Sequence, residues 1–350
     1  MVGIVTALFF LKVLSSHGWD PLVFVLLTPG NTPVGQTWNV GYDGRFSYHL
    51  AINPLGATEG LDEPNYRYQR ILFPLIVKLL SFGQPSLVPW MMILLNLGAT
   101  ILAAKIIGEM LIRRKVSPMW GGVLFFSIGY LLALRMDLLE PLALALALGG
   151  WLAKEKDRPG WAILLFALAS LAKDIALLFP VALAVVDFAN GYRGRALLLA
   201  FASCLPYLML FVFLANHFGM PIEAIEKSRL LIVPLAGYAA MQDVPSKIVV
   251  SLWAIAPAVA GGSWAAIEVL RQRFAASWSG DAMLVIACAG LLVILPQPTW
   301  LDPLAILRLA TGLIAALLLW FAAHHRRWLP FAAALWLPSC LVLVLVPGIL

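Results

Sequence analysis

The stretch from Gly41 to Gly83 carries the residues whose types and spacing could do chemistry. It is the longest polar-rich interval in a chain of apolar runs, and it places Asp43 between Gly41 and Gly44. A carboxylate in such an open, partly desolvated position can take a proton from an incoming hydroxyl group, and flanking glycines let a ligand approach closely. The structural alternative is a helix cap, because an acid just before a helix that starts near Arg45 can accept hydrogen bonds from free backbone N–H groups.

Two arginines, Arg67 and Arg70, follow in the same stretch. They are three residues apart, so they share one face of a helix. They could contact the headgroups of membrane lipids in general, or they could hold the phosphate of one particular lipid. The sequence favours neither of these interpretations over the other.

Other charged residues stand at the ends of apolar runs further along the chain. They are Asp137, Glu140, Lys173, Asp174 and Arg308. Each has a structural alternative: helix-dipole stabilisation for Glu140, a mutual ion pair for Lys173 with Asp174, and snorkelling to the membrane surface for Arg308. All of them fall on the same predicted side of the membrane as Asp43, which favours a shared polar cavity.

The composition indicates what positions these residues. Hydrophobic residues make up 62% of the chain and charged residues 12%, whereas soluble domains carry about 25% charge. With a mean hydropathy of +0.91 and long apolar runs, the sequence predicts an all-α polytopic integral membrane protein. Half of the 24 Lys and Arg residues lie in five short clusters between apolar runs. That is an orientation signal, so membrane lipids and not nucleic acid are the expected partners.

About eleven transmembrane helices are predicted, with the N-terminus cytoplasmic and Asp43 on the outer face. The spans are 1–16 (or as far as 27), 85–112, 118–134, 142–153, two short helices within 160–188, 196–215, 248–270, 282–295, 304–323 and 329–350. Between the first two spans, two amphipathic helices are expected to lie in the membrane interface. Their apolar faces are marked by Tyr42, Phe46 and Leu50, and by Ile71, Leu75 and Leu79.

The interval 160–188 has 29 residues, too many for one span of about 20 and too few for two. Two short helices meeting at Lys173 and Asp174 would bring all five basic clusters onto one face, as the positive-inside rule requires. The clusters are 113–115, 154–158, 193–195, 271–273 and 326–327. The turn would then lie within the thickness of the membrane, where charges are costly and usually functional.

The chain divides into two predicted modules. Residues 1–216 form a catalytic transmembrane module with the first outer loop at 28–84, and residues 217–350 form a variable module with an outer loop at 217–247. The three cysteines lie inside apolar spans, which indicates neither a disulfide framework nor a metal knuckle. No motif for a phosphate-binding loop, a zinc protease or a nucleophile elbow occurs. No cofactor is therefore assigned, although Asp43 with Asp137 or Glu140 could bind a divalent cation.

The segments GYDGRFSYHLAINP and RYQRILFPLIVKLL resemble the GT-C class of integral-membrane glycosyltransferases. The similarity is to the bacterial and archaeal branch related to the eukaryotic GPI second mannosyltransferase. Those enzymes show an aspartate at the start of an interfacial helix, in a Y/W-D-G/A-x-x-Y-x-x-I-A pattern that Tyr42–Ala51 resembles. Their R-Y-x-R-I-L-x-P-L segment is matched by Arg67–Leu75. Weaker similarities are E-P at Glu140–Pro141 and a K/R-E-T-like turn, which here reads Lys173–Ile175 with Asp for Glu. The resemblance covers about residues 20–190.

This resemblance implies an inverting transfer of one mannose-like hexose from a polyprenyl-phosphate donor to a lipid or glycan acceptor on the extracytoplasmic face of a bacterial or archaeal plasma membrane. Asp43 would be the general base. The donor phosphate would be held by Arg67, Arg70, Lys173 and Arg308. Supporting or acceptor-binding residues would be Tyr42, Arg45, Asp137, Glu140 and Asp174.

Three other functions are possible for such a chain. The main alternative is a transporter or flippase of a lipid-linked compound. Such proteins usually show two related halves, and this chain shows no two halves of similar sequence. A non-catalytic scaffold subunit would not require Asp43. A membrane transferase of acyl or phospho groups would require a nucleophile or histidine within the membrane, for which His49 is a weak candidate.

Overall fold

The protein is helical throughout the part of the chain that its computed structural model describes. That part is residues 1–350 without 26–41, 55, 57–60, 220–229, 273–277 and 343–350. Among these residues there are helices and turns and no strand, which confirms the all-α prediction.

The elements fall in two groups in chain order. Those before the second loop are α1 (Val2–Ser16), η1 (Pro21–Phe24), α2 (Gly44–Ile52), α3 (Pro64–Tyr68), α4 (Leu72–Leu80), η3 (Pro85–Leu87), α5 (Val88–Arg113), η4 (Pro118–Gly121), α6 (Gly122–Phe125), α7 (Ile128–Arg135), α8 (Glu140–Glu155), α9 (Pro159–Ala172), η5 (Asp174–Leu177), α10 (Leu178–Ala189) and α11 (Arg193–Phe218). Those that follow are α13 (Ala236–Ala240), α14 (Val244–Val250), the π-helical turn η6 (Ser251–Ile255), α15 (Ala256–Gln272), α16 (Gly280–Val293), α17 (Gln297–Trp300), α18 (Pro303–His324), η7 (Arg326–Trp328), α19 (Leu329–Trp336) and η8 (Leu337–Cys340).

Four helices in the described residues are long and apolar enough to cross a membrane: Pro85–Arg113, Arg193–Phe218, Val244–Arg271 and Pro303–His324. A bent pair, Pro118–Phe125 with Ile128–Arg135, makes a fifth if it is one span. These helices indicate an integral membrane protein. The count of about eleven stays a prediction, because α1, α9 and α16 are apolar but have only 15, 14 and 14 residues.

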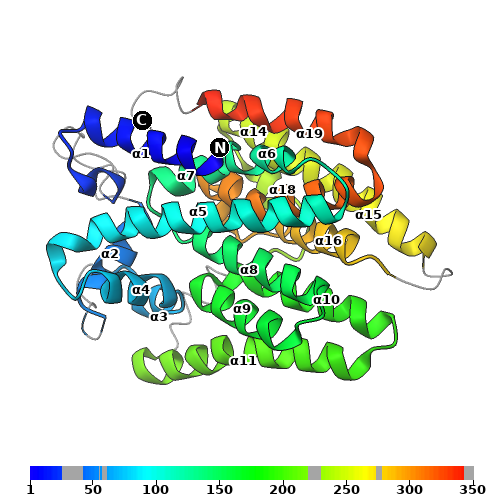
Figure 1. The fold of residues 1–350 in the computed structure, drawn as a ribbon, viewed down its shortest axis with the longest axis horizontal. Helices are drawn as coiled ribbons and strands as arrows, with labels where there is room; N and C mark the ends of the chain where they lie inside the picture. Colours follow the sequence, from blue (N-terminus) through cyan, green and yellow to red (C-terminus); the bar gives the residue numbers. More distant parts are fainter. Residues whose placement is uncertain (26–41, 55, 57–60, 220–229, 273–277, 343–350) are drawn as a thin grey trace.

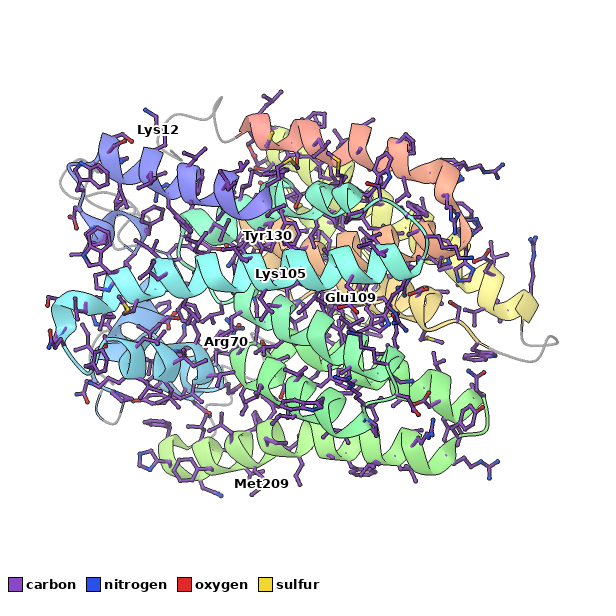
Figure 2. The ribbon with its side chains drawn as sticks, in the orientation of Figure 1. Lys12, Arg70, Lys105, Glu109, Tyr130 and Met209 are labelled. Carbon is purple, nitrogen blue, oxygen red and sulfur yellow. The ribbon has the colours of Figure 1, made fainter. Side chains whose placement is uncertain are left out.

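The long helices run roughly side by side, with α18 near the middle of the bundle and α11 along one edge (Figure 1). Burial follows this arrangement. An apolar stretch of 18 residues in α18 is 78% buried inside the protein, whereas the corresponding stretch of α11 is 17% buried. Met209 projects from the outer side of α11 (Figure 2) and is exposed. The exposed apolar surface of α11 therefore suits contact with lipid tails, whereas α18 forms the core.

The two short helices predicted within 160–188 are present as α9 and α10, and the turn between them begins at Lys173, as predicted. The start of α9 and the end of α10 lie at the same end of the bundle, as two ion pairs show. Lys154, at the end of α8, pairs with Asp187 of α10 at 2.7 Å, and Asp157, just before α9, pairs with Arg195 of α11 at 3.6 Å. The chain therefore runs out along α9 and returns along α10.

The basic clusters gather at one end of the bundle. Arg114 pairs with Glu155 at 2.5 Å, and Arg326 donates to the backbone oxygen of Arg114 at 2.8 Å. Near the cluster at 271–273, Glu268 contacts His325 at 2.8 Å. Since Glu140 and Glu155 lie at opposite ends of α8, the residues around Glu140 occupy the other end of the bundle.

The predicted third span, 118–134, is not one straight helix. It bends by 61° between α6 and α7. The break is stabilised because Ser339 accepts a hydrogen bond from the backbone N–H of Ile128 at 2.9 Å. A Cβ atom added at Gly129 would lie 2.0 Å from the backbone oxygen of Leu307, so the glycine lets α7 approach α18 closely.

Both predicted helices of the first outer loop form, and they differ in the face that packs against the protein. In α2, Phe46 and Leu50 of the predicted apolar face are buried. In α4 the buried residues include Phe73 and Val77, whereas Leu75 and Leu79 are 44% and 75% exposed. The predicted apolar face of α4 therefore lies on the protein surface, which suits a helix in the membrane interface.

Candidate active site

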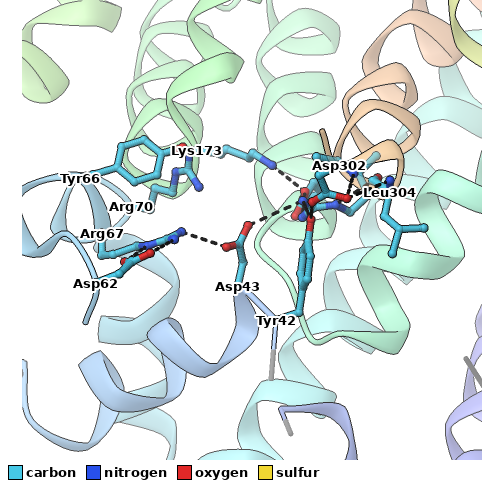
Figure 3. A network of polar contacts seen from close by, with 12 residues as sticks. Tyr42, Asp43, Asp62, Tyr66, Arg67, Arg70, Lys173, Asp302 and Leu304 are labelled. Carbon is cyan, nitrogen blue, oxygen red and sulfur yellow. Dashed lines mark hydrogen bonds and ion pairs between the residues drawn. The ribbon is translucent and has the colours of Figure 1, made fainter. Parts of the chain in front are cut away.

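Asp43 stands immediately before α2, yet its carboxylate makes no capping hydrogen bond to that helix. Instead Oδ1 pairs with Nη1 of Arg67 at 2.9 Å and Oδ2 lies 3.6 Å from Nη2 of Arg308. Figure 3 shows the Asp43 carboxylate beside Arg67, with dashed lines that run from it to Arg67 on one side and towards the group around Tyr42 and Asp302 on the other. The helix-cap interpretation of Asp43 is therefore wrong.

Arg67 is held on several sides. Nε and Nη2 donate to the two carboxylate oxygens of Asp62 at 2.8 and 2.7 Å, and the guanidinium lies 3.7 Å from the centre of the Phe46 ring. A bidentate carboxylate and an aromatic face fix the plane of a guanidinium group. Arg67 therefore presents Nη1 to Asp43 in a defined orientation.

Arg70 lies just beyond α3, in the turn before α4. It donates to the hydroxyl of Tyr66 and pairs with Asp174 at 3.3 Å. Lys173, in contrast, pairs with Glu140 at 2.5 Å. The mutual ion pair considered for Lys173 and Asp174 is therefore absent from the structure, since each of the two has another partner.

Glu140 is the most buried acid of this cluster. Its Oε1 accepts from Nζ of Lys173 and, at 2.9 Å, from Nη1 of Arg308, and all three side chains are 8% exposed or less. Arg308 is thus shared between Glu140 and Asp43, and it does not snorkel to the surface.

Two residues of the cluster were missed by sequence reasoning. Asp302 accepts a hydrogen bond from the hydroxyl of Tyr42, which in turn accepts from Nη2 of Arg308 at 2.6 Å. Asp302 also caps α18 by accepting from the backbone N–H groups of Leu304 and Ala305. Asp62 is the other missed residue. Asp302 immediately precedes a proline and Asp62 lies two residues before one. Acids in such positions usually stand at helix starts, so neither position marks a functional site in the sequence.

Asp137 and Arg45 contact residues other than the charged side chains of this cluster. Asp137 accepts from Nδ2 of Asn96 on α5 at 2.6 Å, and the guanidinium of Arg45 lies 4.7 Å from the centre of the Phe46 ring. Asp137 adopts a left-handed backbone conformation with φ of 50°. This turn separates its side chain from that of Glu140, although the two are only three residues apart in the sequence.

The Asp137–Asn96 pair has the geometry of a neutral carboxylic acid bound to an amide. Asp137 Oδ2 and Asn96 Oδ1 are buried without a hydrogen-bond partner, and both are acceptors unless the acid carries a proton. Burial raises the pKa of Asp137 to about 8, although the hydrogen bond from Asn96 lowers it. A proton on Oδ2 would supply the missing donor.

We expect this acid to make the protein less stable as the pH rises. A folded pKa above the unfolded value of about 3.9 gives a stabilisation that is full below about pH 4 and is lost as the pH rises through about 8. Asp137→Asn keeps a donor for Asn96 and does not titrate. Thermal unfolding in detergent should therefore show a variant whose stability changes less than that of the wild type between pH 6 and 9. Parallel curves for the two proteins would contradict the neutral acid.

The start of α2 is pressed against the turn that carries Asp137. A Cβ atom added at Gly44 would lie 2.2 Å from the backbone oxygen of Met136. We expect Gly44→Ala to destabilise the protein by about 1–3 kcal/mol, the usual cost of overpacking, and to displace Asp43. The matched control is Gly98→Ala in α5, where an added Cβ meets nothing within 4 Å, so helix propensity should leave stability equal or slightly higher. Equal unfolding temperatures for the two variants would contradict this packing constraint.

A cleft of about 620 Å³ opens beside the cluster. Its charged and polar lining includes Asp62, Glu63, Tyr66, Arg67, Arg70, Lys173, Asp174 and Tyr207, and its apolar lining includes Ile175, Leu177, Leu178, Val181, Leu230, Leu291, Leu295 and Leu309. A smaller cavity of about 50 Å³, which shares Lys173 and Leu309 with the cleft, reaches Glu140 and Arg308. The cleft is therefore lined by both apolar and charged side chains, and it shares Lys173 with the cavity that reaches Glu140 and Arg308.

The electrostatics keep Asp43 ionised. Burial alone would raise its pKa, but the guanidinium groups of Arg308 and Arg67 outweigh burial and lower the pKa to about 2. With both arginines turned towards it, the carboxylate is a weak base. An anion that drew these arginines away would strengthen it.

The residues present do not fit a divalent cation. Among the described residues no group of three His, Cys, Asp or Glu side chains is close enough to hold a metal ion. Asp137 faces Asn96, and the Oε1 atom of Glu140 is occupied by Lys173 and Arg308. The predicted cation at Asp43 with Asp137 or Glu140 is therefore not supported by the geometry.

Comparison with known protein families, with curated protein sequences and with solved structures found no match to this chain. The functional interpretation therefore rests on the site itself and on the motif resemblance around Asp43 and Arg67.

Proposed function

We propose that this protein is a glycosyltransferase that moves a single sugar from a polyprenyl-phosphate donor to a hydroxyl group of a lipid or glycan acceptor. One observation supports this most: the carboxylate of Asp43 lies between Arg67 and Arg308, beside a largely apolar cleft that is also lined by Arg67, Arg70 and Lys173. A carboxylate and cations side by side suit a reaction that needs a base for one substrate and a clamp for the phosphate of the other.

The reaction follows from these roles. The acceptor oxygen attacks the anomeric carbon of the sugar from the side opposite the phosphate, and the bond between that carbon and the phosphate oxygen breaks. Asp43 takes the proton of the acceptor hydroxyl, and the configuration at the anomeric carbon is inverted. The negative charge that develops on the departing phosphate is stabilised by nearby cations, with Arg67, Arg70, Lys173 and Arg308 as the candidates.

Binding of the donor would also make Asp43 a stronger base. In the empty site, Arg308 and Arg67 lower the pKa of Asp43 to about 2, against the effect of burial. A donor phosphate that shares those arginines weakens their hold on the carboxylate. Asp43 then becomes a better proton acceptor at the moment when both substrates are present.

The membrane orientation supports a lipid-linked donor. The basic clusters lie at the end of the bundle opposite Glu140, and the positive-inside rule assigns that end to the cytoplasm. The site would then face the extracytoplasmic side. Nucleotide sugars are absent there, so the sugar must arrive on a lipid carrier.

The test is sugar transfer by the purified protein in detergent, with radiolabelled polyprenyl-phosphate sugars, nucleotide sugars as the comparison, and a membrane glycolipid extract as acceptor. We expect transfer from at least one lipid-linked donor and none from nucleotide sugars. No transfer from any donor, together with movement of a fluorescent lipid-linked sugar between the leaflets of vesicles that contain the protein, would favour the transporter.

A further inference from the structure

The four cationic side chains of the site differ in how many hydrogen-bond and ion-pair partners they have. Arg67 binds both oxygens of Asp62 as well as Asp43, and Arg308 binds Glu140, Tyr42 and Asp43. Lys173 has a close partner of its own in the buried Glu140.

Arg70 is the least satisfied of the four. Its contacts with described residues are the Tyr66 hydroxyl and an ion pair of 3.3 Å with Asp174. Its Nε atom is buried and has no hydrogen-bond partner among those residues. Arg70 also lines the wide cleft. A guanidinium group with a buried, unused donor can take another acceptor at little cost.

Asp174 can be separated from its partner more easily than the other acids that line the cleft beside an arginine. Asp62 is bound to Arg67 by two hydrogen bonds of 2.8 and 2.7 Å, whereas Asp174 has one ion pair of 3.3 Å with Arg70. Glu140 is 7% exposed, whereas the side chain of Asp174 is 35% exposed. It is the first residue of the short turn η5 and lies in the wall of the same cleft. Solvent-exposed ion pairs contribute little to stability, so an incoming anion can replace this carboxylate.

We propose that Asp174 is a displaceable counterion that holds the place of the substrate phosphate on Arg70, and that the site accepts a phosphodiester with one negative charge. This inference rests on the proposed function and deepens it. It makes Arg70 the main anchor of the donor phosphate, whereas Arg67 and Arg308 are shared between that phosphate and Asp43.

The charge balance supports a monoanion. The cluster contains four cations, Arg67, Arg70, Lys173 and Arg308, and five acids, Asp43, Asp62, Glu140, Asp174 and Asp302. Exchange of the Asp174 carboxylate for a phosphodiester keeps that balance. A diphosphate would bring at least one further negative charge, and no cation of the cluster is without an acid.

The same balance would favour release of the product. Transfer of the sugar converts the phosphodiester into a phosphate monoester, which carries a second negative charge above a pKa of about 6. The product would then compete less well with Asp174 for Arg70. The acid that makes room for the donor would return to its partner as the product leaves.

The test is binding without turnover. The probes are the methyl ester of farnesyl phosphate, farnesyl phosphate and farnesyl diphosphate, which share one tail and differ in charge, measured by ligand-induced thermal shift in detergent at pH 8. We expect the wild type to bind the methyl diester most tightly. Asp174→Asn should bind the diester about three to ten times more tightly, since the competing ion pair is lost. Arg70→Gln should lose at least tenfold in affinity.

Controls keep the test decisive. Asp157→Asn removes an acid that is 81% exposed at the other end of the bundle, and its affinities should equal those of the wild type. Arg70→Lys keeps the charge without the planar fork, and intermediate binding is expected if Arg70→Gln does not fold. Unchanged diester binding in Asp174→Asn, or tightest binding of the diphosphate by the wild type, would overturn the proposal.

The outcome is independent of sugar transfer. If the enzyme transfers sugar and Asp174→Asn binds the diester as the wild type does, the counterion is wrong and the transferase stands. If Asp174→Asn tightens binding and no donor is ever consumed, the lipid-phosphate site stands and the transferase is wrong.

Discussion

Asp43→Asn is expected to lower the rate of sugar transfer by about 100- to 10,000-fold, the contribution usual for a positioned general base. Asparagine has the same shape as aspartate and cannot accept the proton of the acceptor hydroxyl. The loss should fall on kcat, because the arginines that would hold the donor are unchanged. Initial rates at saturating donor and acceptor, with purified wild-type and variant protein, measure the effect.

The control must separate loss of the base from loss of a charge beside Arg67. Asp62→Asn serves this purpose, since Asp62 also binds Arg67 but is 47% exposed, and its other hydrogen bond comes from the backbone N–H of Glu63. We expect a fall of less than tenfold for Asp62→Asn. Thermal unfolding should show both variants folded. Transfer by Asp43→Asn at the rate of the wild type would remove Asp43 from the chemistry.

Glu140→Gln is expected to have the largest effect on stability, a loss of about 3–5 kcal/mol. Glu140 is the shared partner of Lys173 and Arg308, and removal of the acid from a buried ion pair leaves the cations without compensation. Unfolding in mixed micelles with increasing denaturing detergent measures the change. The site should be disturbed together with the fold, because Arg308 also contacts Asp43.

The matched control is an acid that pairs with a lysine near the surface. Glu109 pairs with Lys156 at 2.6 Å and is 45% exposed, so Glu109→Gln should cost at most about 1 kcal/mol. Similar losses for Glu109→Gln and Glu140→Gln would mean that Glu140 does not hold the cluster together.

The sequence predicted the large features because they depend on local patterns. The turn at Lys173 followed from counting basic clusters on each side of the membrane, and α2 followed from the spacing of Phe46 and Leu50. The gathering of Asp43, Arg67, Arg70, Glu140, Lys173, Asp174 and Arg308 agrees with the predicted polar cavity. Their catalytic roles stay predictions.

Which residues pair with each other in the cluster could not be predicted from the sequence, because the pairing depends on packing between distant helices. Adjacent charges such as Lys173 and Asp174 suggest a pair, yet each meets a different residue across the bundle. Asp302 is 260 residues from Tyr42 and resembles an ordinary helix cap. Asp137 was predicted to share a polar cavity with Glu140 because both fall on the same predicted side of the membrane, but its left-handed backbone turns it towards α5.

The antiparallel pair α9 and α10 has a consequence for the surrounding bilayer. With 14 and 12 residues, these helices are about 21 and 18 Å long, whereas the hydrocarbon core of a bilayer measures about 30 Å. As membrane spans, these helices would leave a hydrophobic mismatch, which lipids relieve by thinning locally. A lipid phosphate bound at Arg70 would then sit deeper than the headgroups around it, and a thicker bilayer would make its entry more costly. Membrane thickness, set by acyl-chain length, would thus control how readily a lipid phosphate reaches this site.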